Sequence, residues 1–99
     1  MVETTDLIKM HHRPLHDIAN EILADWKNAP DPARGYAVAM TTLRSIDDNY
    51  GLDSAVEIVS RFLGTARSWK GPVADRIKTE LKGVLAVHDG EMQKRQQPA

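Results

Sequence analysis

Histidines near the N-terminus have the spacing in this chain that best suits metal chemistry. His12 and His16 are four positions apart, which places two imidazoles on one face of a helix. His11 and Asp17 stand beside them. Pro14 lies between the two histidines, so the helix is expected to begin only there. Because no distant acid or histidine offers a third ligand, we expect a solvated segment that binds no metal and no cofactor.

A second candidate is the acidic turn at residues 47–53, which superficially resembles a calcium-binding loop. Such a loop needs glycine at its sixth position and glutamate at its twelfth. Counted from the first residue of the turn, those positions hold Leu52 and Ile58, so calcium is not expected. Gly51 and Ser54 are better explained as the end of one helix and the N-cap of the next.

Other catalytic patterns are missing from the sequence. Its 99 residues make about one small domain, and they include no cysteine. A thiol nucleophile, a disulfide framework and a cysteine-ligated zinc are therefore excluded. The sequence also contains neither a glycine-rich phosphate loop nor a Gly-x-Ser-x-Gly elbow. We therefore expect a protein that is not an enzyme.

Charge is balanced over the whole chain but not along it. The 13 Lys plus Arg and 14 Asp plus Glu give a net charge of −1, which disfavours nonspecific binding to nucleic acid or membranes. Residues 17–57 hold eight acids and three bases, a balance of −5, whereas residues 61–82 hold six bases and two acids, a balance of +4. Either the two halves pack together and offset each other, or the basic segment binds an acidic partner or nucleic acid.

Apolar residues spaced three and four positions apart indicate amphipathic helices, and no alternating strand pattern competes. The sequence predicts an all-α fold, a single compact bundle of about four short helices. The bundle domain is expected at residues 13–89, after a flexible N-terminal lead at 1–12 and before a disordered polar tail at 90–99. Glycine stops are expected at Gly51 and Gly90. The inward-facing sets are Leu15, Ile18, Ala19, Ile22, Leu23 and Trp26; Tyr36, Ala39, Met40, Leu43, Ile46 and Tyr50; Ala55, Ile58, Val59, Phe62, Leu63 and Ala66; and Val73, Ile77, Leu81, Val84 and Leu85.

Cap residues mark where the second and third of these helices begin. Asp31 and Pro32 are typical of an N-cap followed by the first helical residue. Ser54, with Glu57 three positions later, fits a capping box, although Asp53 could be the cap instead.

The two tryptophans lie near helix ends, and core packing is the favoured interpretation for both. Trp26 follows the first apolar set, and Trp69 lies between the third and fourth. Tryptophan and arginine are also enriched at the centres of protein interfaces. Because Arg67 and Lys70 flank it, Trp69 is the better candidate for an interface anchor.

The last two helices could instead form a helix-turn-helix that binds DNA. The recognition helix would be the basic helix at residues 72–86, with Arg76, Lys78 and Lys82 on its polar side. Two features weigh against this hypothesis. The connection before the helix exceeds the usual three to four residues, and Asp75 and Glu80 would face the phosphates.

The N-terminus and the apolar runs bear on the compartment. The first residues are polar and acidic, unlike the basic start of a secretory signal. The longest apolar runs are far shorter than the roughly 20 residues that span a bilayer. We therefore expect a soluble cytoplasmic protein with no membrane partner.

Several blocks together resemble a group of small all-helical proteins of unknown function from actinobacteria and their bacteriophages. The resemblance covers about residues 18–85 and implies the extent of the fold and a bacterial or phage cytoplasm. It carries over no activity, cofactor or site residue. The blocks are Asp25-Trp26-Lys27, Tyr36 to Met40, Ile46 to Ala55, Ile58-Val59, Phe62-Leu63, Trp69-Lys70-Gly71 and Ile77 to Lys82.

The favoured hypothesis is a small non-enzymatic protein-interaction module, encoded by a phage and binding a bacterial host protein. A phage protein is the other partner considered. A homodimer is an open alternative, and a small DNA-associated regulator is the competing function. The expected protein-contact residues are Trp69, Arg67 and Lys70 in one surface, and Asp47, Asp48, Tyr50 and Asp53 in the other; the DNA hypothesis uses Arg76, Lys78 and Lys82.

Overall fold

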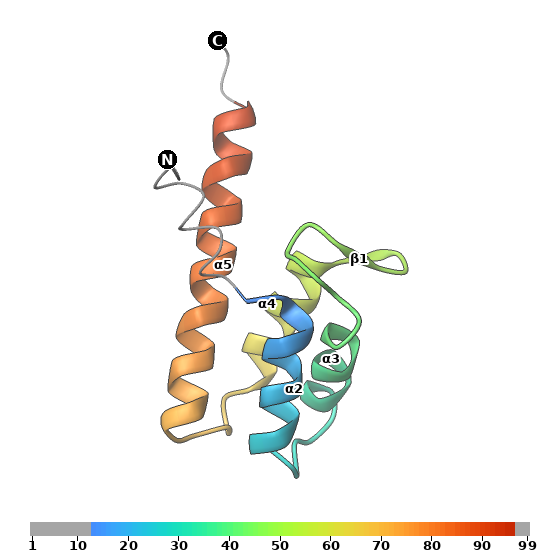
Figure 1. The fold of residues 1–99 in the computed structure, drawn as a ribbon, viewed down its shortest axis with the longest axis vertical. Coiled ribbons are helices and arrows are strands. Elements are labelled where there is room, and N and C mark those ends of the chain that lie inside the picture. The colour runs from blue at the N-terminus through green and yellow to red at the C-terminus, as the bar shows by residue number, and fades with distance from the viewer. Residues whose placement is uncertain (1–12, 97–99) are drawn as a thin grey trace, which may run out of the picture.

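A computed structural model of the protein describes residues 13–96, with side chains described for residues 13–90. The described part contains four α-helices and one two-stranded antiparallel sheet. It is therefore mostly helical rather than purely all-α, and the sheet is a feature that the sequence pattern did not indicate. Figure 1 shows the elements in chain order: α2 (Leu15–Asp25), α3 (Ala33–Met40), β1 (Asn49–Tyr50), β2 (Asp53–Ser54), α4 (Ala55–Thr65) and α5 (Pro72–Gln96).

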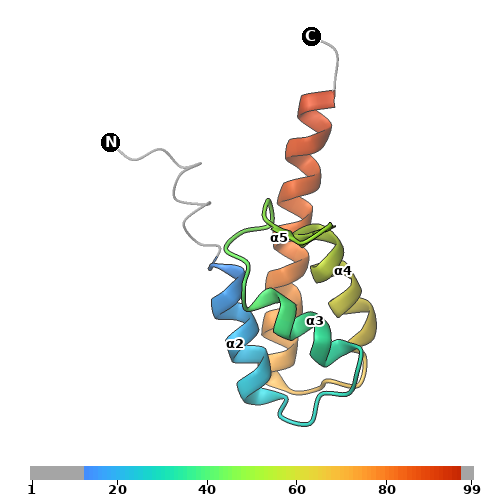
Figure 2. The same cartoon turned by 90° about the vertical axis from the view of Figure 1, so that its right-hand side faces the viewer.

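The helices surround one apolar core. Helices α2 and α4 each contact both α3 and α5, so the core lies between α3 on one side and α5 on the other (Figures 1 and 2). The apolar faces expected for α2, α4 and α5 are confirmed, because their central residues are buried. The largest fully buried side chains are Phe62, Leu15, Ile18, Ile22, Met40, Leu43, Ile77, Leu81 and Val59.

Two of the expected helix starts are confirmed and one is wrong. The Ser54 hydroxyl caps α4 by accepting a hydrogen bond of 3.1 Å from the backbone N–H of Glu57. Helix α5 begins at Pro72 as expected. At α3, however, Pro32 itself occupies the N-cap, and no side chain of the described residues caps the helix. The prediction that Asp31 caps this helix is therefore wrong.

The second helix is much shorter than the sequence pattern indicated. It ends at Met40 rather than continuing to Gly51. The hydroxyls of Thr41 and Thr42 donate to backbone carbonyls three residues back, which offers the chain an alternative to further helical turns. Leu43 is nevertheless buried. The apolar spacing therefore predicted its burial correctly, although Leu43 lies in a loop and not in a helix.

That loop, residues 41–48, caps the N-terminus of α2. The backbone N–H groups of Leu15 and His16 donate to the carbonyls of Arg44 and Leu43, at 2.9 and 2.8 Å. The first N–H groups of a helix have no partner within the helix, so these contacts between distant segments satisfy two of them. The Asp48 carboxylate holds the loop itself, accepting from the backbone N–H of Arg44 at 2.7 Å and of Ser45 at 3.4 Å.

A short hairpin follows the loop. Tyr50 of β1 lies opposite Asp53 of β2, and Gly51 adopts a positive φ of 61° in the turn between them. Glycine enters this conformation without steric cost, so Gly51 serves a hairpin turn and not a helix stop. The Ala55 N–H donates to the Asp48 carbonyl at 2.8 Å, which connects the loop directly to the start of α4.

Helix α5 is longer than expected and extends beyond the other helices (Figures 1 and 2). The stop expected at Gly90 is wrong, because the helix continues to Gln96. Residues 90–96 are therefore helical rather than a disordered tail, and residues 1–12 and 97–99 lie outside the described part. Each helix in the described part of the chain is too short or too polar to span a lipid bilayer.

Substitutions at Asp48 and at its neighbour Asp47 test whether the hydrogen bonds of Asp48, rather than its negative charge alone, stabilise the loop. Replacing Asp48 by Ala removes the acceptor for two backbone N–H groups, and we expect the free energy of unfolding to fall by about 1–2 kcal/mol. Asp47→Ala removes an exposed carboxylate and should change stability by no more than about 0.5 kcal/mol. Urea unfolding followed by circular dichroism measures both. Equal effects of the two substitutions would contradict this role for Asp48.

Candidate protein-contact site

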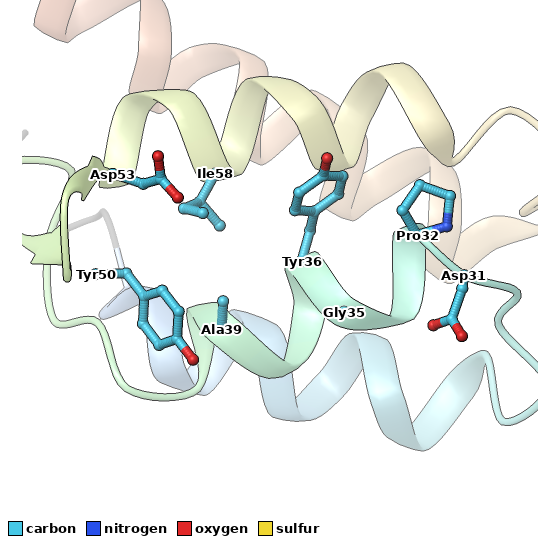
Figure 3. A pocket seen from close by; sticks show the side chains of 8 residues that line it. All are labelled: Asp31, Pro32, Gly35, Tyr36, Ala39, Tyr50, Asp53 and Ile58. Carbon is cyan, nitrogen blue, oxygen red and sulfur yellow. The ribbon is translucent and has the colours of Figure 1, made fainter.

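An open groove of about 420 Å³ lies between α3 and α4, with the hairpin bordering one end. Figure 3 shows its lining side chains. Tyr36 comes from α3, Tyr50 from β1 and Ile58 from α4. The complete lining is Asp31, Pro32, Gly35, Tyr36, Ala39, Tyr50, Asp53 and Ile58.

The two tyrosines are the large side chains of this groove. Tyr36 is half-buried and packs against the core, whereas Tyr50 is 46% exposed on the short strand β1. Their rings enter from different elements and face the same space (Figure 3). A tyrosine presents an apolar ring together with a hydroxyl that can donate or accept a hydrogen bond. The pair can therefore contact both apolar and polar groups of a ligand.

The charge in the groove is entirely negative. Asp31 and Asp53 stand at opposite ends of the row of lining residues (Figure 3), and none of the eight residues is basic. Arg61 approaches Asp53 from α4, but its guanidinium lies 3.8 Å from that carboxylate and 3.6 Å from that of Glu57. Both side chains of the Arg61–Asp53 pair are about half exposed, so this contact is weak.

The four residues of the acidic turn predicted as one contact surface do not all lie together in the structure. Tyr50 and Asp53 are brought together by the hairpin and both line the groove. Asp48 folds back onto the loop backbone. Asp47 lies 3.5 Å from His88 of α5 and has a highly exposed side chain. Only two of the four predicted residues therefore belong to the groove.

The sequence pattern indicated other roles for several groove residues. It predicted core positions for Tyr36, Ala39 and Ile58 and a helix cap for Asp31. The break of the chain at Asp31-Pro32 and the tyrosine one helical turn later were visible signals. Their meeting with the hairpin was not visible, because it depends on where α3 ends.

Trp69 is part of the core, so its role as an exposed interface anchor is wrong. It is only 2% exposed, stacks on Trp26 with ring centroids 5.6 Å apart, and meets Phe62 edge to face. Its indole N–H donates to the Asp25 carboxylate at 2.9 Å. The core interpretation is thereby confirmed for Trp69, and the half-buried Trp26 packs against the same cluster. Exposed Arg67 and Lys70 remain beside this cluster without an exposed ring between them.

Lys78 is folded back over the same aromatic cluster. Its ammonium donates to the Trp69 carbonyl at 2.7 Å and lies 6.0 Å from the centroid of the Trp69 ring. Burial, followed by the positive charge of Lys70, lowers the pKa of Lys78 below its ordinary value. Lys78 therefore stabilises the start of α5 rather than projecting towards a ligand.

Arg76 belongs to an ion-pair network that joins α2 to α5. It contacts the Glu21 carboxylate, whose other oxygen lies 2.9 Å from Arg13. Arg13 also binds Glu80 with two hydrogen bonds, at 2.8 and 3.0 Å. The hydrogen bond from Arg76, and then that from Arg13, hold the pKa of Glu21 below its ordinary value.

These contacts bear on the helix-turn-helix hypothesis. Two of its three proposed DNA-binding residues, Arg76 and Lys78, bind other parts of the chain, and Lys82 is exposed. Helix α4 ends at Thr65 and α5 begins at Pro72, so the connection is longer than the usual turn. Glu21–Arg76 and Asp53–Arg61 also pair the acidic segment with the basic one.

The histidine segment lies mostly outside the described residues. His16 is described, and its Nδ1 lies 3.2 Å from the neighbouring Asp17 carboxylate. Within the described part of the chain, no group of three or more histidine, cysteine, aspartate or glutamate residues could hold a metal ion.

Comparisons with protein-family models, with curated proteins and with solved structures found no match to this chain. The resemblance to actinobacterial and phage proteins therefore stays a prediction.

The burial of Trp69 can be tested by comparing the stability of a Trp69 variant with that of a variant at exposed Arg67. Trp69→Ala removes a core ring, and we expect the free energy of unfolding to fall by about 3–5 kcal/mol. If the parent protein is less stable than this, the variant should not fold. Arg67→Ala should stay within about 0.5 kcal/mol of the parent protein. Thermal unfolding by circular dichroism distinguishes the two. A Trp69→Ala protein as stable as Arg67→Ala would refute the core assignment.

The lowered pKa of Glu21 predicts a pH dependence of stability. The carboxylate stabilises the fold fully above its ordinary pKa of 4.5, and this contribution is lost as the pH falls through the lowered folded pKa. Glu21→Gln should therefore be less stable than the parent protein at neutral pH, and the difference should shrink in strong acid. Urea unfolding across this range measures it.

Glu57→Gln is the matched control for that experiment. Glu57 is exposed and its contact with Arg61 is long, at 3.6 Å, so this variant should show little pH-dependent loss. A Glu21→Gln deficit that is the same at every pH would contradict the role of the ion pair.

Proposed function

We propose that the protein is a small non-enzymatic interaction module that binds a partner protein through the groove between α3 and α4. The observation that carries the proposal is the pair of tyrosine rings, Tyr36 and Tyr50, which face an apolar floor between two aspartates. Tyrosine is enriched at the energetic centres of protein interfaces, surrounded by polar residues at the rim.

The hairpin adds exposed apolar surface next to the groove. Leu52 at its tip is fully exposed and stands two residues after Tyr50. A single exposed apolar residue is ordinary, but this one shares the hairpin with Tyr50. A partner bound at Tyr50 would lie close to this side chain.

The chemistry of the lining supports binding over catalysis. The eight residues include no histidine, serine, cysteine or lysine, and the two carboxylates stand at opposite ends. General acid–base catalysis needs a donor and an acceptor within hydrogen-bond reach of one reacting group. The contacts of Arg76 and Lys78 similarly favour protein binding over DNA binding. The proposal includes a cytoplasmic location and, following the resemblance, a phage-encoded protein whose partner is a bacterial host protein.

A photo-cross-linking amino acid placed at Tyr50 tests this function in the native cell. We expect one discrete cross-linked species, because Tyr50 is exposed at the groove. The same amino acid at Thr79, which is exposed on α5, is the matched control and should not form that species. Equal cross-linking from both positions, or none from Tyr50, would contradict the proposal. A species of twice the chain's mass would instead identify a homodimer.

Once the partner is purified, Tyr50→Ala should weaken its binding by roughly 10–100-fold, the loss typical of a hot-spot tyrosine. Thr79→Ala should leave the dissociation constant unchanged. Calorimetry gives both values, and circular dichroism checks that the half-exposed tyrosine was removed without unfolding.

A further inference from the structure

We propose that the groove between α3 and α4 binds an extended, proline-containing peptide segment that carries a basic residue at each end. This inference rests on the proposed function and names the chemistry of the partner. It is argued from the aromatic lining, the size of the groove and the placement of its charges.

The aromatic lining suits proline. Tyr36 and Tyr50 present ring surfaces from two different elements to one open space (Figure 3). Proline-rich segments form polyproline II helices, which dock into aromatic-lined grooves and lose little conformational entropy because they are already extended. The tyrosine hydroxyls can in addition donate to the exposed backbone carbonyls of such a segment.

The size of the groove disfavours the other common peptide modes. A docked helix is about 10 Å wide and needs apolar anchors over several turns. The apolar floor here offers only Pro32, Ala39 and Ile58 besides the tyrosine rings. Addition of a strand needs a sheet edge, and both strands of this hairpin are two residues long.

The length of α3 sets the length of the peptide. Its eight residues rise about 12 Å at 1.5 Å per residue. Asp31 and Asp53 lie beyond the two ends of α3 (Figure 3), so the distance to be covered is somewhat longer than the helix. A polyproline II segment rises 3.1 Å per residue, and two basic residues with four others between them are five rises, or about 15 Å, apart. The basic residues of the partner should therefore be separated by about four others.

The two ends of the groove are complementary to basic side chains. Asp31 is exposed and, with Pro32 as the N-cap of α3, is not used as a helix cap. Among the described residues, the one ion-pair contact of the Asp53 carboxylate is the weak one with Arg61, at 3.8 Å. Arginine binds a carboxylate through two parallel hydrogen bonds, so an arginine at each end would place the prolines over the tyrosines.

Synthetic peptides and the full chain test this inference. The probe is Ala-Arg-Pro-Leu-Pro-Pro-Arg-Ala with both ends blocked. One control peptide replaces both arginines by glutamate, and the other replaces all prolines by alanine. We expect saturable binding of the probe by calorimetry, with shifts of the Tyr36 and Tyr50 resonances by NMR. Each control should bind at least about tenfold more weakly, and added salt should weaken binding of the probe.

Variants of the protein locate the contact. Asp53→Asn and Asp31→Asn should each lower the affinity for the probe by roughly tenfold, since each variant loses one charged hydrogen-bonded pair. Glu57→Gln, an exposed acid of α4 outside the lining, is the matched control and should leave affinity unchanged.

The outcomes separate this inference from the function beneath it. Equal binding of the probe and the glutamate peptide, or unchanged affinity in both aspartate variants, would overturn the inference. Failure of the probe to bind, while Tyr50 still cross-links to a partner in cells, would overturn the inference and leave the function standing. Failure of both experiments would refute the function as well.

Discussion

The hydrogen bonds between the 41–48 loop and the first turn of α2 determine where the groove forms. The N–H groups of Leu15 and His16 would otherwise lack partners, and the carbonyls of Arg44 and Leu43 accept from them. These contacts require the chain to leave the helical path after Met40. The loop then passes through Asp48 to the hairpin, which sets Tyr50 and Asp53 opposite α3.

Periodicity predicted the parts of the fold whose burial is local. The apolar faces of α2, α4 and the first half of α5 follow a helical period, and the structure buries them as expected. The same period extended through Leu43 and Ile46, which are buried or half-buried but come from a loop. A spacing pattern records which residues are buried and not whether the intervening backbone is helical. The end of α3 depends on hydrogen bonds to α2, which no local pattern contains.

The candidate site was predictable to the same extent. Tyr50 and Asp53 were singled out because they stand together in the sequence, and the hairpin keeps them together. Asp31 and Tyr36 join them only through tertiary structure. Trp69 shows the opposite error: it is surrounded by basic residues in the sequence, but its ring stacks on Trp26 and its N–H binds Asp25. Part of the charge asymmetry is likewise used within the molecule, as Glu21–Arg76 shows.

Amide hydrogen exchange at Leu15 and His16 tests most directly that the 41–48 loop organises this fold. These amides are in the first turn of α2, where exchange is ordinarily fast, but they donate to Arg44 and Leu43. The first-turn amides of α5, at Val73 and Ala74, have no such acceptor among the described residues. We predict that Leu15 and His16 exchange at least about tenfold more slowly than Val73 and Ala74. Exchange at the same fast rate in both helices would contradict the account.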